Sequence, residues 1–304
     1  RVFIMSQHIR NVTVYLGSSG HARPVFYNNA YSLGQSLAEQ GLHLIFGGMA
    51  AGSMRSLSHG ALEHGGKVTG IIPTKIRDSE RINRQVSEII DVPTLWERKK
   101  VMFDLADMII AMPGGYGTLD EAMEAMYWKV LGLHNKPIAF INTDGYWSPF
   151  FEWIHKSVQG GFIHEDVLEQ FYVYQNARDI DFSEFEASGD DTLATGFPHF
   201  EDEIFEATRT PIIIDQANIE QAYKLMTALV LKQLGAHDRQ IGVLNKDSQF
   251  DLLTEWIYRA RDEHFITRQC PSLATYRRTE KGLMEALEKK EHIVIDLHAD
   301  KWGD

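Results

Sequence analysis

The sequence contains a single cysteine, Cys270, among its 304 residues. One cysteine excludes a disulfide within the chain and fits a reducing compartment. Long apolar runs are also missing, because no stretch approaches the roughly 18 consecutive apolar residues of a membrane-spanning helix and no apolar leader run opens the sequence. We therefore expect a cytoplasmic protein without a membrane-spanning segment.

Positive charge is in short supply. The chain has 30 Lys and Arg residues against 42 Asp and Glu, a formal net charge of −12 at pH 7. A surface for nucleic acids or anionic membranes needs an excess of positive charge, so neither is expected as a partner. A small phosphorylated ligand in a local site is compatible with this balance. The histidines lack the spacing of metal ligands, so no metal site is predicted.

What the sequence does contain is an alternation of strand and helix patterns. Short apolar runs end in glycines and are followed by helical patterns of about 10–15 residues, which predicts an α/β fold with a parallel sheet and helices on both faces. Residues 74–93 interrupt this alternation as a polar excursion with a weak pattern. Ligands bind at the carboxyl ends of the strands in such sheets. The glycines at three strand ends, Gly17, Gly47 and Gly114, are therefore predicted to meet at one crevice.

The stretch from Pro113 to Glu121 joins a buried strand directly to a helix that we predict over residues 119–131. Strand, glycine turn and helix is the geometry of a phosphate cradle, because glycines let several backbone N–H groups converge on one anion. A tight turn closed by a capping box, with Thr118 as N-cap and Glu121 reaching back to it, explains the same residues. Local pattern leaves both open. Asp120 and Glu121 would repel a phosphate, so a cation nearby has to offset them, or Glu121 has to face another part of the ligand.

A second helix begins at the Thr94–Glu97 capping box and is predicted to reach about Ala106. Arg98 lies on its apolar stripe, so its guanidinium needs a partner. A carboxylate such as Glu121 or Glu124 is one candidate, and an anionic ligand is the other.

Taken together, these motifs resemble the LOG (LONELY GUY) family over about residues 11–187. Three segments carry the resemblance: Gly47-Gly48-x-x-x-Gly52-x-Met54, Glu97-Arg98-Lys99, and Pro113-Gly114-Gly115-x-Gly117-Thr118-x-x-Glu121. The family's usual Met-His before Glu-Arg-Lys is replaced here by Leu95-Trp96. Members of the family are often mislabelled as possible lysine decarboxylases.

The resemblance implies a Rossmann-like, doubly wound parallel sheet in a homodimer or higher homo-oligomer. It also implies a hydrolase that cleaves the N-glycosidic bond of nucleoside 5′-monophosphates, AMP-like or cytokinin riboside monophosphates, to free base and ribose 5-phosphate without a cofactor. By motif match, Arg98 and Glu121 are the catalytic residues. The phosphate- and substrate-binding positions are Gly17, Ser18, Gly47, Gly48, Lys99, Gly114, Gly115, Gly117 and Thr118.

Two other functions remain open at this point. One is a non-catalytic carrier of a nucleotide or of the molybdenum cofactor on the same fold, although such carriers typically lack the pair formed by Arg98 and Glu121. The other is a regulatory assembly protein whose C-terminal part binds partners. A decarboxylase would need a Schiff-base lysine for pyridoxal phosphate. Lys99 has no supporting motif for that role, and we reject this interpretation.

The C-terminal part repeats the middle of the chain. A shift of 103 positions brings Asn142-x-Asp144 onto Asn245-x-Asp247, with several further identities in the same register. The copy has lost the loop glycines, and Lys224 stands where Glu121 would be. We predict a catalytic domain over residues 11–187, a linker over 188–207 and a degenerate half-copy over 208–304. We expect this half-copy to dock on the catalytic domain through the apolar stripe Tyr223, Met226, Val230 and Leu234.

Overall fold

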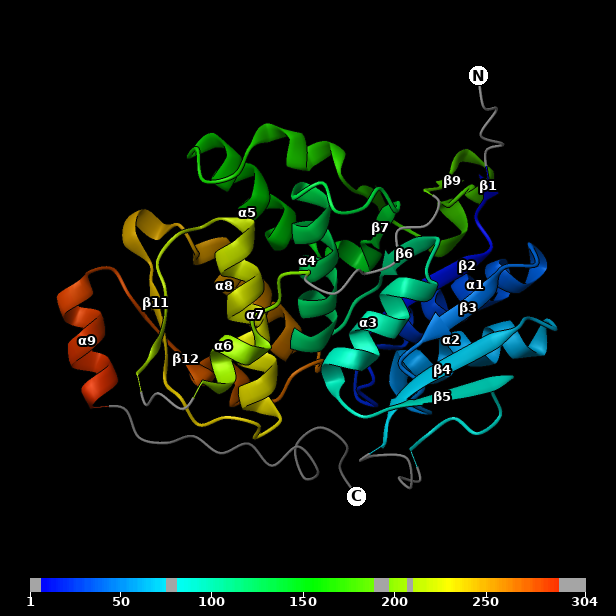
Figure 1. The fold of residues 1–304 in the computed structure, drawn as a ribbon, viewed down its shortest axis with the longest axis horizontal. Coiled ribbons are helices and arrows are strands. Elements are labelled where there is room, and N and C mark those ends of the chain that lie inside the picture. The colour runs from blue at the N-terminus through cyan, green and yellow to red at the C-terminus, as the bar shows by residue number, and fades with distance from the viewer. Residues whose placement is uncertain (1–6, 75–80, 189–196, 207–209, 290–304) are drawn as a thin grey trace.

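The computed structural model describes residues 7–74, 81–188, 197–206 and 210–289. Within these residues the chain forms a seven-stranded parallel sheet, a three-stranded parallel sheet and a two-stranded antiparallel ribbon (Figure 1). The ribbon pairs β1 (Gln7–His8) with β9 (Glu186–Ala187). No helix in the described part of the chain is long and apolar enough to cross a membrane.

The large sheet has the strand order β5-β4-β3-β2-β6-β7-β8. Its strands are β2 (Asn11–Tyr15), β3 (His43–Phe46), β4 (Val68–Pro73), β5 (Glu88–Val92), β6 (Met108–Ala111), β7 (Ile138–Ile141) and β8 (Tyr172–Tyr174). The chain first builds outward from β2 to β5 and then places β6 on the other side of β2. The topology therefore reverses between β2 and β6, which is where doubly wound sheets bind ligands.

Helices cover both faces of this sheet because successive strand residues point to opposite sides. Val12 and Val14 of β2 pack in the core beneath α1 (Pro24–Glu39) and α2 (Gly52–Glu63). Thr13 and Tyr15 face the other side, where α3 (Leu95–Leu105), α4 (Tyr116–Val130) and α5 (Ser148–Gln159) lie. The predicted doubly wound fold class is confirmed.

The small sheet has the order β10-β11-β12. Its elements are β10 (Ile212–Ile214), α7 (Ile219–Gln233), β11 (Ile241–Leu244), α8 (Asp251–Asp262), β12 (Ala274–Arg277) and α9 (Glu280–Glu288). The bounds of α7, β11 and α8 are those of α4, β7 and α5 moved by 103 residues. Asp144 and Asp247 share a left-handed backbone, with φ of 53° and 51°. The sequence repeat is therefore also a structural repeat.

The half-copy docks on the first half, as we expected from its apolar stripe. Helix α7 lies along α4, and α8 lies along α5 (Figure 1). Tyr223 and Met226 are completely buried, whereas Leu234 at the end of the stripe is 46% exposed. The boundaries that we predicted between the parts of the chain stay a prediction.

Part of the predicted linker is also packed against the first half. Residues 189–196 and 207 of that stretch lie outside the described residues. Helix α6 (Glu201–Phe205) follows Pro198, whose carbonyl accepts a hydrogen bond of 2.8 Å from the indole of Trp128. His199 stacks on Trp96 with ring centroids 4.1 Å apart. These residues thus belong to the core around α3 and α4.

Two local predictions need correction. The polar excursion over residues 74–93 contains strand β5, which lies at the sheet edge, so only part of it is buried and its apolar signal is weak. Short 3₁₀ turns also join the main elements: η2 (Thr143–Gly145), η3 (Glu165–Glu169), η4 (Ala177–Asp179), η5 (Phe182–Glu184), η6 (Lys246–Ser248) and η7 (Cys270–Leu273). The second correction concerns α4, which begins at Tyr116 and not at residue 119.

Candidate active site

The glycine junctions after β2 and β6 touch each other. The N–H of Gly17 donates to the carbonyl of Pro113 at 3.1 Å. A methyl group on Gly114 would lie 2.1 Å from Oγ1 of Thr118 and 2.7 Å from the nitrogen of Gly17. The segment between β3 and α2 also meets the loop after β2, because a methyl group on Gly52, the first residue of α2, would lie 2.1 Å from the Ser19 carbonyl. The predicted convergence of the strand ends is therefore observed, and it leaves no room for side chains at these glycines.

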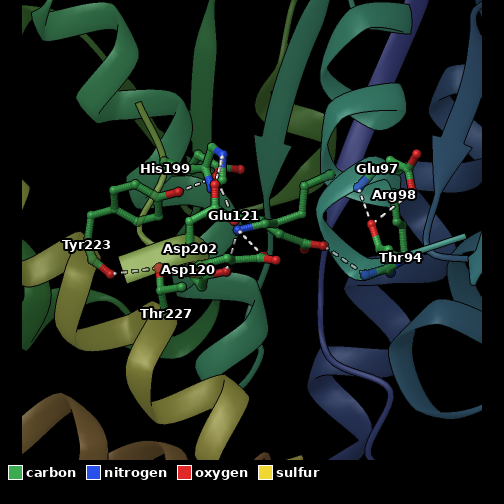
Figure 2. Close-up of polar contacts among 12 residues, drawn as sticks. Thr94, Glu97, Arg98, Asp120, Glu121, His199, Asp202, Tyr223 and Thr227 are labelled. Carbon is green, nitrogen blue, oxygen red and sulfur yellow. Dashed lines mark hydrogen bonds and ion pairs between the residues drawn. The ribbon is translucent and has the colours of Figure 1, made fainter. Parts of the chain in front are cut away.

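Arg98 finds its partner in Glu121. Its Nη1 lies 3.0 Å from Oε1 of Glu121 (Figure 2). Its Nε donates to the Ile71 carbonyl at 3.2 Å. The two side chains are only 15% and 7% exposed. Gly47 admits the guanidinium, since a methyl group at Gly47 would lie 1.9 Å from Nη2 of Arg98. Gly48 beside it has φ of 75°, a conformation that favours glycine. The loop after β3 thus shapes the place of Arg98.

Two opposing effects act on the pKa of the Glu121 carboxyl group. Burial raises its pKa, Arg98 lowers it, and the net result lies above the ordinary value. Tyr15, at the end of β2, has a pKa well above its usual range, first because of burial and then because of the charge of Glu121. Tyr15 is therefore a neutral phenol close to the ion pair. Tyr15 was not predicted from the sequence, because its pattern is that of an ordinary residue of a buried strand.

Lys99 lies next to this pair but faces a different set of groups. Its Nζ is 3.1 Å from Asp120, 3.1 Å from Glu124 and 3.5 Å from Glu201. Burial alone would lower the pKa of Lys99, but Asp120 and Glu124 raise it well above its ordinary value. Lys99 is thus a buried ammonium, whereas a Schiff base forms from a neutral amine. A contact between Lys99 and substrate stays a prediction.

Two hydroxyl groups of the half-copy bind the acidic cluster that Asp120, Glu124 and Glu201 form around Lys99. The hydroxyl of Thr227 donates to Oδ1 of Asp120 at 2.6 Å, and the hydroxyl of Tyr223 donates to Glu124 (Figure 2). Neither residue was predicted from the sequence to lie near the site. The signal available was the spacing of Tyr223 and Thr227, which are four residues apart and therefore carry two hydroxyls on one face of α7.

Helix α4 begins earlier than predicted, which removes the Thr118–Glu121 capping box. Gly115 is the N-cap and Tyr116 the first helical residue, so Thr118 and Glu121 both lie inside the helix. The N–H groups of the first turn of a helix carry the positive end of its dipole, and here the N–H of Thr118 donates to the carbonyl of the N-cap Gly115 at 3.1 Å. Gly115, Gly117 and Thr118 lie in or next to this turn. The hydroxyl of Tyr146 donates to the Gly114 carbonyl and so fixes the loop before α4.

No cluster of three or more His, Cys, Asp or Glu residues in the described ranges could hold a metal ion. The arrangement instead combines a helix N-terminus and glycine junctions with a buried arginine and carboxylate. A helix N-terminus of this kind can bind a phosphate. A buried carboxylate beside it can stabilise a positive charge that develops on the same ligand.

Comparison with known proteins places this chain in a family. A family profile described as "Possible lysine decarboxylase" matches residues 54–181. The cytokinin riboside 5′-monophosphate phosphoribohydrolase LOG of Oryza sativa subsp. japonica is 37% identical over 171 residues, which are 56% of this chain and 71% of that protein. LOG5 of Arabidopsis thaliana, with the same activity in its name, is 37% identical over 177 residues, or 58% and 78%. The chain belongs to the LOG family.

Solved structures with a similar fold include two proteins that bind the molybdenum cofactor. The molybdenum cofactor binding protein of Rippkaea orientalis has a TM-score of 0.44 and 23% identity, covering 58% of this chain and 93% of that protein. The Moco carrier protein of Chlamydomonas reinhardtii has a TM-score of 0.43 and 22% identity, covering 56% and 91%. The matches to LOG relatives and to these structures all leave about two fifths of this chain uncovered.

The acidic cluster predicts a pH dependence of stability. Burial raises the pKa of Glu124 to about 7 from 4.5, although Lys99 beside it acts to lower it. Because the folded state holds a proton that the unfolded chain releases, the free energy of unfolding should fall as pH rises from about 4.5 to about 7. We expect Glu124 to contribute a loss on the order of 3 kcal/mol over that range. Urea unfolding at pH 5 and pH 8 measures it.

Glu124→Gln is the control for this prediction, because it removes one titrating carboxyl and keeps its size. Glu121 and Glu201 also have raised pKa values, and both remain in the variant. The change in unfolding free energy between the two pH values should therefore be smaller in Glu124→Gln than in the wild type. An equal change in both proteins would show that Glu124 does not titrate in this range.

Proposed function

We propose that this chain hydrolyses the N-glycosidic bond of nucleoside 5′-monophosphates and releases the free base and ribose 5-phosphate. The observation that carries the proposal is the ion pair between Arg98 and Glu121, buried one turn along the helix that follows the glycine loop. The relatives named as phosphoribohydrolases support the same reaction.

In this proposal the 5′-phosphate lies at the start of α4, against the N–H groups of Gly115 and Gly117 and beside Thr118, whose own N–H donates to the Gly115 carbonyl at 3.1 Å. The loops of Gly17, Ser18, Gly47 and Gly48 form the neighbouring part of the site. The ribose then extends toward Glu121, because this residue lies one helical turn beyond the phosphate. The acid near the phosphate is balanced by Arg98.

Bond cleavage builds positive charge on the ribose ring as the base departs. The carboxylate of Glu121 stabilises that oxocarbenium-like state and orients a water toward C1′. The water oxygen bonds to C1′, the bond from C1′ to the base nitrogen breaks, and the proton released by water balances the one taken up by the base. Arg98 acts to lower the pKa of Glu121 against the raising effect of burial, and it fixes the direction of the carboxylate.

The test is to incubate the protein with a panel of 5′-monophosphates and to separate the products by chromatography. Adenine, prenylated-adenine and pyrimidine nucleotides are included because the motif contacts phosphate and ribose rather than the base. We expect free base and ribose 5-phosphate in equal amounts from at least one nucleotide. Tight binding without release of base from any of them would instead favour the carrier function.

A further inference from the structure

The contacts between the two halves of the chain are reciprocal. At the repeat spacing of 103 residues, Tyr223 is the counterpart of Asp120, and Thr227 is the counterpart of Glu124. Thr227 binds Asp120, and Tyr223 binds Glu124. Swapping the two halves therefore turns one contact into the other. Contacts that interchange in this way indicate a two-fold axis that relates two copies of one surface.

A second pair of contacts obeys the same rule on the neighbouring helices. Nζ of Lys156 on α5 donates to the Ser248 carbonyl at 3.4 Å. Arg259, the counterpart of Lys156 on α8, donates to the carbonyl of Gly145, the counterpart of Ser248. The α4–α7 and α5–α8 contacts thus share one pseudo-two-fold axis. An interface of this kind normally joins two identical chains, but here both surfaces belong to one chain.

This arrangement carries a segment of the half-copy onto the glycine junctions. Phe265 is 1% exposed and packs edge-on against Phe26 and Tyr146. A methyl group on Gly17 would lie 2.5 Å from Cδ1 of Phe265, and one on Gly115 would lie 2.9 Å from the Phe265 carbonyl. Two of the predicted phosphate-loop glycines are therefore in direct contact with residues that follow α8.

Polar contacts fix the same segment on both sides of Phe265. The hydroxyl of Ser19 donates to the His264 carbonyl at 2.5 Å. Arg23 forms a bidentate pair with Glu263, with N–O distances of 2.6 and 2.7 Å. These contacts join the loop after β2 to the half-copy, and a bidentate arginine pair specifies geometry as well as adding attraction.

The equivalent segment of the first half has no such role. Phe162 is the counterpart of Phe265 at the repeat spacing, yet it is 44% exposed. The difference follows from what each one faces. Phe265 meets the glycine junctions of the first half. The half-copy has Gln216-Ala217-Asn218 at its own loop, and its described residues, 210–289, contain no counterpart of the strand before Gly17.

We infer that the half-copy takes the place of a second subunit within the same chain, and that Glu263, His264, Phe265 and Ile266 form a wall of the nucleotide site. One chain then holds one site, completed in cis by its own C-terminal part. The surface of α4 and α5 is already covered, so a homodimer of this chain has to form through another face. The function of the wall rests on the proposed hydrolase, but its position can be tested without turnover.

Hydrogen exchange of the full-length protein tests the wall directly. Phe265→Ala should speed amide exchange in the glycine loops, residues 17–20 and 113–118, by at least about tenfold, because it removes their cover. Phe162→Ala is the matched control, the same change at the equivalent exposed position, and should leave these loops unchanged. If Phe265→Ala unfolds the whole chain, Phe265→Leu replaces it under the same criterion. Unchanged loop exchange in a folded Phe265 variant would overturn the inference.

Co-expression distinguishes closure within one chain from closure between chains. Glu121→Gln retains the wall, and Phe265→Ala retains the catalytic pair, so a swapped dimer of the two would contain one intact site. Closure in cis predicts that the co-expressed pair is no more active than the average of the two variants. Activity above that average, reaching about a quarter of wild type where each variant alone is inactive, would show exchange between chains and overturn it. Hydrogen exchange needs no substrate. A protein that releases no base would therefore overturn the proposed hydrolase, and the hydrogen-exchange experiment would still test the wall.

Discussion

Glu121→Gln should lower the turnover of nucleoside 5′-monophosphates by roughly 10² to 10³. The substitution keeps the shape of the side chain and an oxygen that can still accept from Nη1 of Arg98, which lies 3.0 Å from the native carboxylate. It removes the negative charge that we propose to face the oxocarbenium. The measurement is kcat for base release under saturating substrate.

The stability of this variant has to be measured alongside its activity. The capping box that would have made the change nearly neutral is absent from α4, and Glu121 instead pairs with a buried guanidinium. We expect a loss of about 1–3 kcal/mol, the typical cost of weakening a buried polar contact. Glu220→Gln makes the same change on the first turn of α7, where the side chain is exposed, and should keep full activity. Near-wild-type turnover in a folded Glu121→Gln protein would contradict the mechanism.

The parts of the site that the sequence predicts are those with a local cause. Gly17, Gly47 and Gly114 each follow an apolar strand, and parallel strands bring their carboxyl ends to one edge of the sheet. Arg98 falls on the inward stripe of its helix, and an inward arginine requires an anion. Its two candidate carboxylates were Glu121 and Glu124, and the structure pairs it with the first.

The parts that the sequence does not predict depend on packing between distant segments. Ser19 and His264 are 245 residues apart, so no local pattern connects them. The start of α4 was misplaced because two glycines near it are poor helix formers, whereas the burial of Tyr116 in the core outweighs that preference. Glu201 lies in the stretch that we predict as a linker, and its position 3.5 Å from the Lys99 ammonium joins segments far apart in the sequence.

A nucleoside without its 5′-phosphate should be a far poorer substrate than the matching monophosphate, with kcat/KM lower by roughly 10³ or more. The phosphate takes no part in bond cleavage, but we propose that it is bound at the N-terminus of α4, where helix N–H groups converge. Its binding energy then holds C1′ of the ribose against Glu121. The loss should appear in kcat as well as in KM, because a ribose without this anchor is rarely in position to react.

Gly117→Ala is a control for the phosphate loop, because alanine keeps the backbone N–H that we propose as the contact with the phosphate. A methyl group on Gly117 would have Val230 as its nearest neighbour at 3.6 Å, an ordinary contact, so the fold should tolerate it. Gly117 lies in the first turn of α4, where its backbone N–H is proposed to face the phosphate. If added inorganic phosphate competes with the monophosphate in the wild type, it should compete at the same site in this variant. Equal kcat/KM for nucleoside and monophosphate in the wild type would remove the phosphate from the glycine loop, because a bound anchor has to favour the ligand that carries it.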